Sequence, residues 1–110
     1  MHQQTARNRR VPLVIDALVR ALVEEGVYPN VAAAAVGFGL KHPRLSRLIK
    51  GTDIAGSRTV GRLCSKLNPR AAAELMQAYL LDERDTVIRT AKETGRPKWD
   101  NLVSVELAKI

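Results

Sequence analysis

The sequence contains few of the side chains from which disulfides and metal sites are built. Its 110 residues include one cysteine, Cys64, and two histidines, His2 and His42. A single cysteine excludes an intrachain disulfide and any Cys-x-x-Cys zinc motif. Neither histidine has a further ligand at metal spacing. We therefore expect no metal and no cofactor, and we expect Cys64 to be a small buried hydrophobic residue rather than a reactive thiol.

Aromatic residues and long apolar runs are also scarce. Aromatic residues make up 4% of the chain, whereas hydrophobic residues make up 45%, most of them Ala, Leu and Val, which suit closely packed helices. No window approaches the roughly 18 apolar residues of a transmembrane helix. The first residues are charged and lack the apolar segment of a signal peptide. We expect a cytoplasmic protein with no membrane partner and, from its length, a single domain with a modest core.

Signatures of an enzyme are missing as well. The sequence has no glycine-rich phosphate loop and no nucleophile elbow. Asp82, Glu83 and Asp85 cluster at an expected helix boundary, where we expect caps and partners of the helix dipole rather than a catalytic pair. We therefore expect a protein that is not an enzyme.

Basic residues are in excess, and their distribution is uneven. The chain has 18 Lys and Arg against 11 Asp and Glu, a net charge of +7. Residues 1–10 contain three arginines and no acid, and residues 41–70 contain eight basic residues against Asp53 alone. The remaining positions hold seven basic and ten acidic residues. Such clustering favours an anionic partner such as nucleic acid over a solvated basic face.

Apolar residues recur at helical spacing and predict an all-α fold. We expect helices over 12–25, 31–38, 43–50 and 58–67, another that begins at Asn68, and a separate one over 83–94. The expected N-caps are Asn30, His42, Ser57 and Asn68. The inward residues should be Val14, Ala17, Leu18, Ala21 and Leu22 on the first helix; Ala72, Leu75, Met76, Tyr79 and Leu80 on the fifth; and Val87, Ile88 and Ala91 on the sixth. The segment 99–110 fits either a helix or a strand, and Asp100 as an N-cap favours a helix.

The stretch Val31 to Lys50, VAAAAVGFGLKHPRLSRLIK, predicts two short helices joined by a tight turn. Gly39 supplies the positive φ that such a turn requires. Ala35 lies four residues before Gly39, and Leu40, Leu45 and Leu48 follow at the spacing of a buried seam; these five residues form the core of the motif. The outer face of the second helix carries side chains that contact phosphates and guanine edges: Lys41, His42, Arg44, Ser46, Arg47 and Lys50. The stretch therefore predicts a DNA-binding helix-turn-helix.

These residues, together with the string LSRLIKG, the linker GTDIAGS and a following helix that opens on serine, resemble the lambda-repressor/Cro-like (XRE) DNA-binding domains. The resemblance covers about residues 12–81 and implies a compact five-helix domain. It also implies a dimeric transcriptional regulator, often a phage repressor or an antitoxin partner, that binds a pseudo-palindromic operator. We expect a basic flexible arm over 1–11 before this domain and a short helical extension for dimerisation over 82–110.

Each part of the chain then has an expected role. Base readout is assigned to Arg44 and Arg47 first, with weaker contacts from His42 and Ser46. Phosphate contacts are assigned to Lys41, Lys50, Arg58, Arg62, Arg7, Arg9 and Arg10. The expected dimer interface contains Trp99, Leu102, Val103 and Leu107. An alternative function is an antitoxin or adaptor whose helical core and C-terminal segment bind a protein partner.

Overall fold

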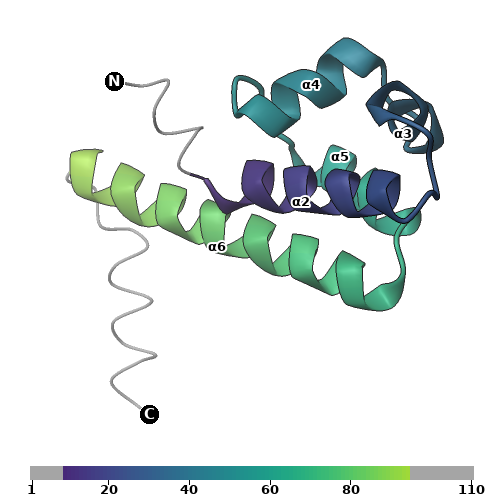
Figure 1. Cartoon of the computed structure of the whole chain (residues 1–110). Coiled ribbons are helices and arrows are strands. Elements are labelled where there is room, and N and C mark those ends of the chain that lie inside the picture. Colours follow the sequence, from purple (N-terminus) through teal and green to yellow (C-terminus); the bar gives the residue numbers. More distant parts are fainter. Residues whose placement is uncertain (1–8, 95–110) are drawn as a thin grey trace.

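The computed structural model describes residues 9–94, and this part of the chain contains five helices and no strand. The helices are α2 (Arg10–Glu24), α3 (Val31–Gly37), α4 (His42–Lys50), α5 (Ser57–Ser65) and α6 (Pro69–Thr94) (Figure 1). The predicted all-α class is confirmed. None of these helices combines the length and the apolar content needed to cross a membrane.

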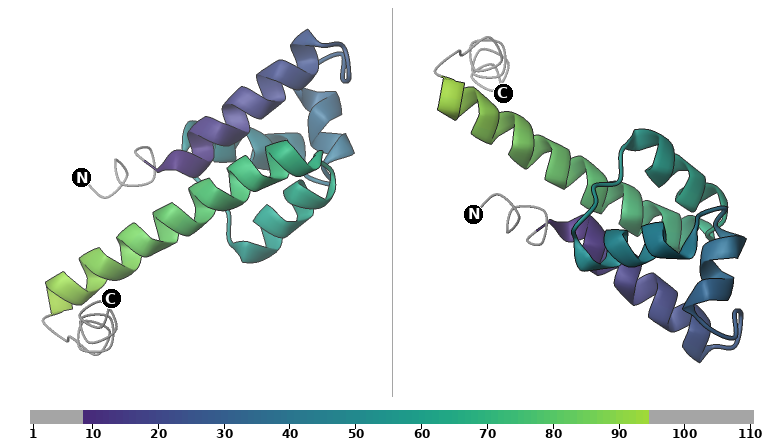
Figure 2. Two further views of the ribbon diagram at one scale, coloured as in Figure 1. Left: turned by 90° about the horizontal axis from the view of Figure 1, so that it is seen from below. Right: turned by 90° about the horizontal axis from the view of Figure 1, so that it is seen from above.

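Helix α2 is the centre of the fold. It packs against α6 on one side and against α3 and α4 on another, while α5 packs against α6. The basic helix α4 and the long helix α6 therefore lie on opposite sides of α2 (Figure 1). The C-terminal half of α6 extends past the beginning of α2 (Figure 2).

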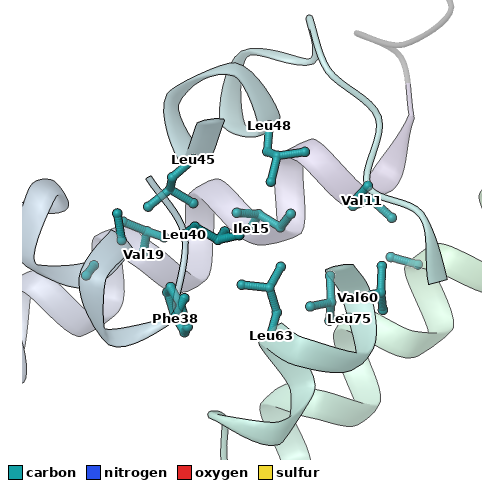
Figure 3. Packing of buried hydrophobic residues seen from close by; sticks show 14 residues of the cluster. Val11, Ile15, Val19, Phe38, Leu40, Leu45, Leu48, Val60, Leu63 and Leu75 are labelled. Atoms are coloured by element: carbon teal, nitrogen blue, oxygen red, sulfur yellow. The ribbon is translucent and has the colours of Figure 1, made fainter. Parts of the chain in front are cut away.

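The core is built from aliphatic side chains of all five helices. The largest fully buried side chains are Val19, Leu45, Leu48, Leu63 and Leu75, and they meet around α2 (Figure 3). Burial of each contributes about 1.5–3 kcal/mol relative to exposure. The apolar seam predicted between 35 and 48 is confirmed as buried, because Ala35, Leu40, Leu45 and Leu48 are each at most 8% exposed.

The inward face of α2 differs from the predicted one. Val11, Ile15 and Val19 are buried, whereas Ala17 and Ala21, which were expected inside, are exposed. The physical reason is area: the helix turns its large β-branched side chains toward the core, and alanine has little apolar surface to bury.

Helix α6 joins what the sequence predicted as two helices. No proline or glycine interrupts positions 70–94, so the backbone continues through the acids at 82–85. The domain boundary expected between residues 81 and 82 therefore falls inside a helix. Along α6 the side chains of Leu75, Ala78 and Asp82 are buried at helical spacing.

Several apolar residues of α6 lie outside the core, contrary to prediction. Met76 is 50% exposed and Leu80 is 61% exposed, while Val87 and Ile88 are 39% and 40% exposed. Met76 and Leu80 lie alongside α2 but on the other side of α6 from the buried Leu75 and Ala78. Val87 and Ile88 lie past the beginning of α2, which starts opposite Asp82 in the middle of α6 (Figure 1).

The predicted caps are correct where an asparagine is involved. The side-chain oxygens of Asn30 and Asn68 each accept a hydrogen bond, at 2.9 Å, from the backbone N–H three positions on. The other two predictions are wrong by one residue. Lys41 rather than His42 precedes α4, and Gly56 rather than Ser57 precedes α5, in both cases without a side-chain cap.

Candidate nucleic-acid interface

The turn between α3 and α4 fixes how α4 is presented. Gly39 has φ +74°, the left-handed region that a side chain with a Cβ resists. The amide of Leu40 donates to the carbonyl of Ala35 at 2.9 Å and so closes the end of α3. Helix α4 then ends at Gly51, with φ +78°. The two positive-φ glycines bound a short helix whose buried leucines hold it against α2.

A cationic concavity lies beside this turn. Its volume is about 400 Å³, and it is lined by Gly39, Leu40, Lys41, Pro43, Arg44, Arg47 and Arg62. Four of the seven lining residues are cationic and none is acidic. The concavity is therefore a site where a phosphate or the edge of a base would be attracted.

Arg62 lies on α5, and its side chain is the fourth cation that lines the concavity beside the turn. Its Nη1 donates to the carbonyl oxygen of Gly39 at 3.2 Å, across 23 positions of sequence. The side chain remains exposed. The tertiary structure thus brings together four of the residues assigned to DNA contacts, from two helices and the turn.

The remaining predicted contacts on this side of the molecule lie outside the concavity. His42, Lys50 and Arg58 are exposed, and Ser46 is half-buried. Pro43, Arg47 and Lys50 form the outermost line of α4, since they recur at positions three or four apart. This line is accessible to a large ligand that covers α4; Pro43 and Arg47 also line the concavity, whereas Lys50 lies outside it.

Asp53 is a site residue that the sequence analysis did not select. Its Oδ2 lies 3.5 Å from Nε of Arg44 and 3.8 Å from Nε of Arg47. Arg44 also donates through Nη2 to Oγ1 of Thr59 at 3.1 Å. The available signal was charge, because Asp53 is the one acid among residues 41–70.

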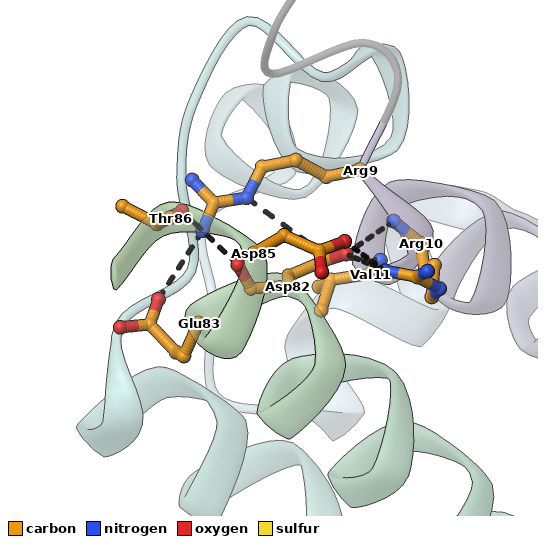
Figure 4. Close-up of polar contacts among 7 residues, drawn as sticks. All are labelled: Arg9, Arg10, Val11, Asp82, Glu83, Asp85 and Thr86. Atoms are coloured by element: carbon orange, nitrogen blue, oxygen red, sulfur yellow. Dashed lines mark hydrogen bonds and ion pairs between the residues drawn. The ribbon is translucent and has the colours of Figure 1, made fainter. Parts of the chain in front are cut away.

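Arg9 and Arg10 do not project as a free basic arm. Arg10 is the first residue of α2, so the expected arm over 1–11 is wrong at its end. Arg9 Nη2 lies 3.2 Å from Oε1 of Glu83, and Arg10 Nη1 lies 2.8 Å from Oδ2 of Asp85 (Figure 4). The acids of α6 thus neutralise the two arginines that were assigned to phosphate. Arg7 lies outside the described residues.

Asp82 occupies the centre of this ionic cluster. Its side chain is 2% exposed. Its Oδ1 and Oδ2 accept hydrogen bonds, each 2.9 Å long, from the backbone amides of Arg10 and Val11 (Figure 4). Helix α2 has no cap from its own N-cap residue Arg9, so a carboxylate from α6 performs that role. The predicted capping function of Asp82 is correct, but the helix it caps is α2.

Three titratable groups outside the concavity have shifted pKa values. The hydrogen bond from Arg10 lowers the pKa of Asp85 and raises that of Arg10. Burial raises the pKa of the Cys64 thiol, whose Sγ lies 3.6 Å from the carbonyl oxygen of Ala72. Cys64 is half-buried, and a raised pKa disfavours the reactive thiolate. Among residues 9–94 no three His, Cys, Asp or Glu side chains are grouped as a metal site.

The expected dimer contacts Trp99, Leu102, Val103 and Leu107 lie outside the described residues. Comparisons of the chain with protein-family models, with curated proteins and with solved structures found no match.

Proposed function

We propose that this protein binds double-stranded DNA and acts as a transcriptional regulator that recognises an inverted repeat as a homodimer. The single observation that carries the proposal is the concavity of about 400 Å³ lined by Lys41, Arg44, Arg47 and Arg62. It adjoins a short, solvent-facing helix of the size that the major groove of B-DNA admits. No acid lines it, and ten of the eleven acids of the chain lie outside residues 41–70.

The proposed division of roles follows from exposure and pairing. Arg47 is 53% exposed at its side chain and is the best placed to donate to the O6 and N7 acceptors of guanine. Arg44 is 38% exposed and is partly engaged by Thr59, so it makes a smaller contribution to base readout. His42 and Ser46 add weaker base contacts.

Phosphate contacts surround this readout. Lys41 and Arg62 flank the turn on one side, and Lys50 and Arg58 extend the cationic surface along α4 and α5. Such contacts fix the register of the helix in the groove without reading sequence. We propose a repressor, because a domain bound to an operator blocks access to the promoter.

Dimerisation is part of the proposal because one short helix reads few base pairs. Two recognition helices about 34 Å apart would contact one face of the DNA. Support comes from α6, where Met76, Leu80 and Val87 are exposed at positions four and seven apart, on one side of the helix. The same apolar stripe favours the second candidate function, an antitoxin or adaptor that binds a protein partner.

Selection of bound duplexes from a random DNA library tests the proposal. The double variant Lys41→Ala/Arg47→Ala should lose the enriched sequence, whereas Arg84→Ala, an exposed arginine on α6, should retain it. Binding through about six to eight phosphate contacts should weaken roughly 10³–10⁵-fold between 50 and 200 mM salt. A chain that enriches no duplex, but retains a protein partner over the same salt range, would favour the adaptor.

A further inference from the structure

We infer that Asp53 determines the sequence selectivity of the cationic surface by positioning Arg47 and Arg44. The inference rests on the proposed function and deepens it: the acid is a positioning residue for two arginines, not a contact to DNA. A carboxylate in the centre of an otherwise basic segment opposes binding to phosphate, so its presence calls for a role that outweighs that effect.

The loop that carries Asp53 is anchored to α4. The amides of Thr52 and Asp53 donate to the carbonyl oxygen of Arg47 at 3.0 and 3.3 Å. The Thr52 hydroxyl donates to the same oxygen at 3.4 Å. The Asp53 carboxylate is oriented as well, because Oδ1 accepts from the amide of Ile54 at 2.8 Å. Oδ2 is thereby fixed relative to the helix whose arginines it faces.

The two arginines use Asp53 differently. Nε of Arg44 is buried and has no hydrogen-bond partner, so the charge of Asp53 at 3.5 Å is its compensation. Nε of Arg47 lies 3.8 Å from the same Oδ2, and the side chain of Arg47 is more exposed than that of Arg44. Within residues 9–94 its terminal Nη groups make no hydrogen bond, which leaves them for a ligand. Asp53 thus holds Arg44 in place and restrains Arg47, the arginine that contacts the base.

Two consequences for DNA binding follow. A restrained Arg47 loses less side-chain freedom when it binds guanine, because the guanidinium is already oriented. The negative charge also repels any phosphate that approaches the arginines in a register where no guanine is offered. Both effects favour the correct sequence over others, so removing the charge should strengthen non-specific binding more than specific binding.

The test compares Asp53→Asn with Asp16→Asn in the full chain. Asp16 on α2 pairs with Arg20 at 3.0 Å and is 31% exposed at its side chain, against 33% for Asp53. Both substitutions remove one negative charge and keep the side-chain shape. The dissociation constant is measured for the selected duplex and for a scrambled duplex of equal length, at one salt concentration.

We expect Asp53→Asn to lower the ratio of specific to non-specific affinity by about tenfold, within the range of one base contact, and Asp16→Asn to change it by less than about twofold. If the wild type binds its duplex specifically and the two variants have equal ratios of specific to non-specific affinity, the role of Asp53 is overturned. A wild type that preferred no duplex would overturn the proposed function, and this inference with it.

A measurement without DNA gives an independent readout. In ¹⁵N-detected spectra, the Nε proton of Arg44 should exchange slowly with water in the wild type and in Asp16→Asn, because the atom is buried beside Asp53. Asp53→Asn should accelerate that exchange. An unchanged exchange rate would overturn the positioning role, and thermal melting of each variant verifies that it is folded.

Discussion

Asp82, in the middle of α6, accepts a hydrogen bond from the backbone amide of Val11, in the first turn of α2, at a distance of 2.9 Å. The two residues are separated by 71 positions of sequence. This contact joins the helix that organises the core to the longest helix of the fold. It also places a buried carboxylate where the amides at the start of α2 need an acceptor.

Removal of this acceptor should be costly. Asp82→Ala is expected to lower the free energy of unfolding by about 2–4 kcal/mol, since it leaves two backbone amides unsatisfied and Arg9 without a buried partner. Glu83→Ala is the matched control: Glu83 is 45% exposed and pairs with the same arginine, so its loss should cost less than about 1 kcal/mol. Urea denaturation measures both, and equal losses would contradict the capping role.

The ion pair between Arg10 and Asp85, on the outside of the ionic cluster, predicts that the stability of the fold depends on pH. The hydrogen bond from Arg10 lowers the pKa of Asp85 in the folded chain. The stabilisation from Asp85 is therefore fully present above its ordinary pKa of about 4, and it is lost as pH falls through the lowered folded value. Compared with Asp85→Asn, the wild type should unfold at higher urea near pH 6. The difference should vanish in strong acid, and a constant difference down to pH 2 would contradict this origin.

At Gly37, steric overlap and helix propensity predict opposite effects of a substitution by alanine. A Cβ at this position would overlap the ring and hydroxyl of Tyr28, which itself packs against Phe38 with ring centroids 6.1 Å apart. Gly37→Ala should therefore destabilise the chain by about 1–3 kcal/mol. Gly61→Ala on α5, where nothing lies within 4 Å, should instead stabilise it by about 0.5–1 kcal/mol.

A double variant separates sterics from propensity at Gly37. In a Tyr28→Ala background the overlap is gone, so Gly37→Ala should become neutral or stabilising. Thermal melting of the four chains completes the cycle, and additive losses would show that the tyrosine is not the obstacle.

The exposed stripe of α6 predicts the site of self-association. Leu80→Gln should leave the unfolding free energy within about 0.5 kcal/mol, because the side chain is already 61% exposed, and should weaken the dimer. Leu13→Gln on α2, at 65% exposure, is the control and should leave it intact. A parallel truncation of residues 96–110 tests the interface expected from the sequence. Sedimentation of the Leu80→Gln variant and of the truncated chain shows which change dissociates the dimer. If both remain dimeric, neither the α6 stripe nor residues 96–110 form the interface.

Much of the local structure could be predicted from the sequence. The helical class, the asparagine caps at 30 and 68, and the positive-φ glycines at 39 and 51 depend on residues within a few positions of one another. The buried seam from Ala35 to Leu48 was predictable for the same reason, since its spacing is that of a helix pair. The concentration of positive charge in 41–70 needs no structure at all.

The tertiary structure decided which distant groups meet. Asp82 and Asp53 are ordinary acids in the sequence, and only the packing of α6 on α2 and the return of the loop toward α4 give them their partners. The same holds for Arg62, which reaches Gly39 across 23 positions, and for Leu80, which the helical spacing predicted inside and the fold leaves outside. The physical reason is that periodicity identifies an apolar face of a helix, but which side of the helix is covered depends on where the neighbouring helix packs against it.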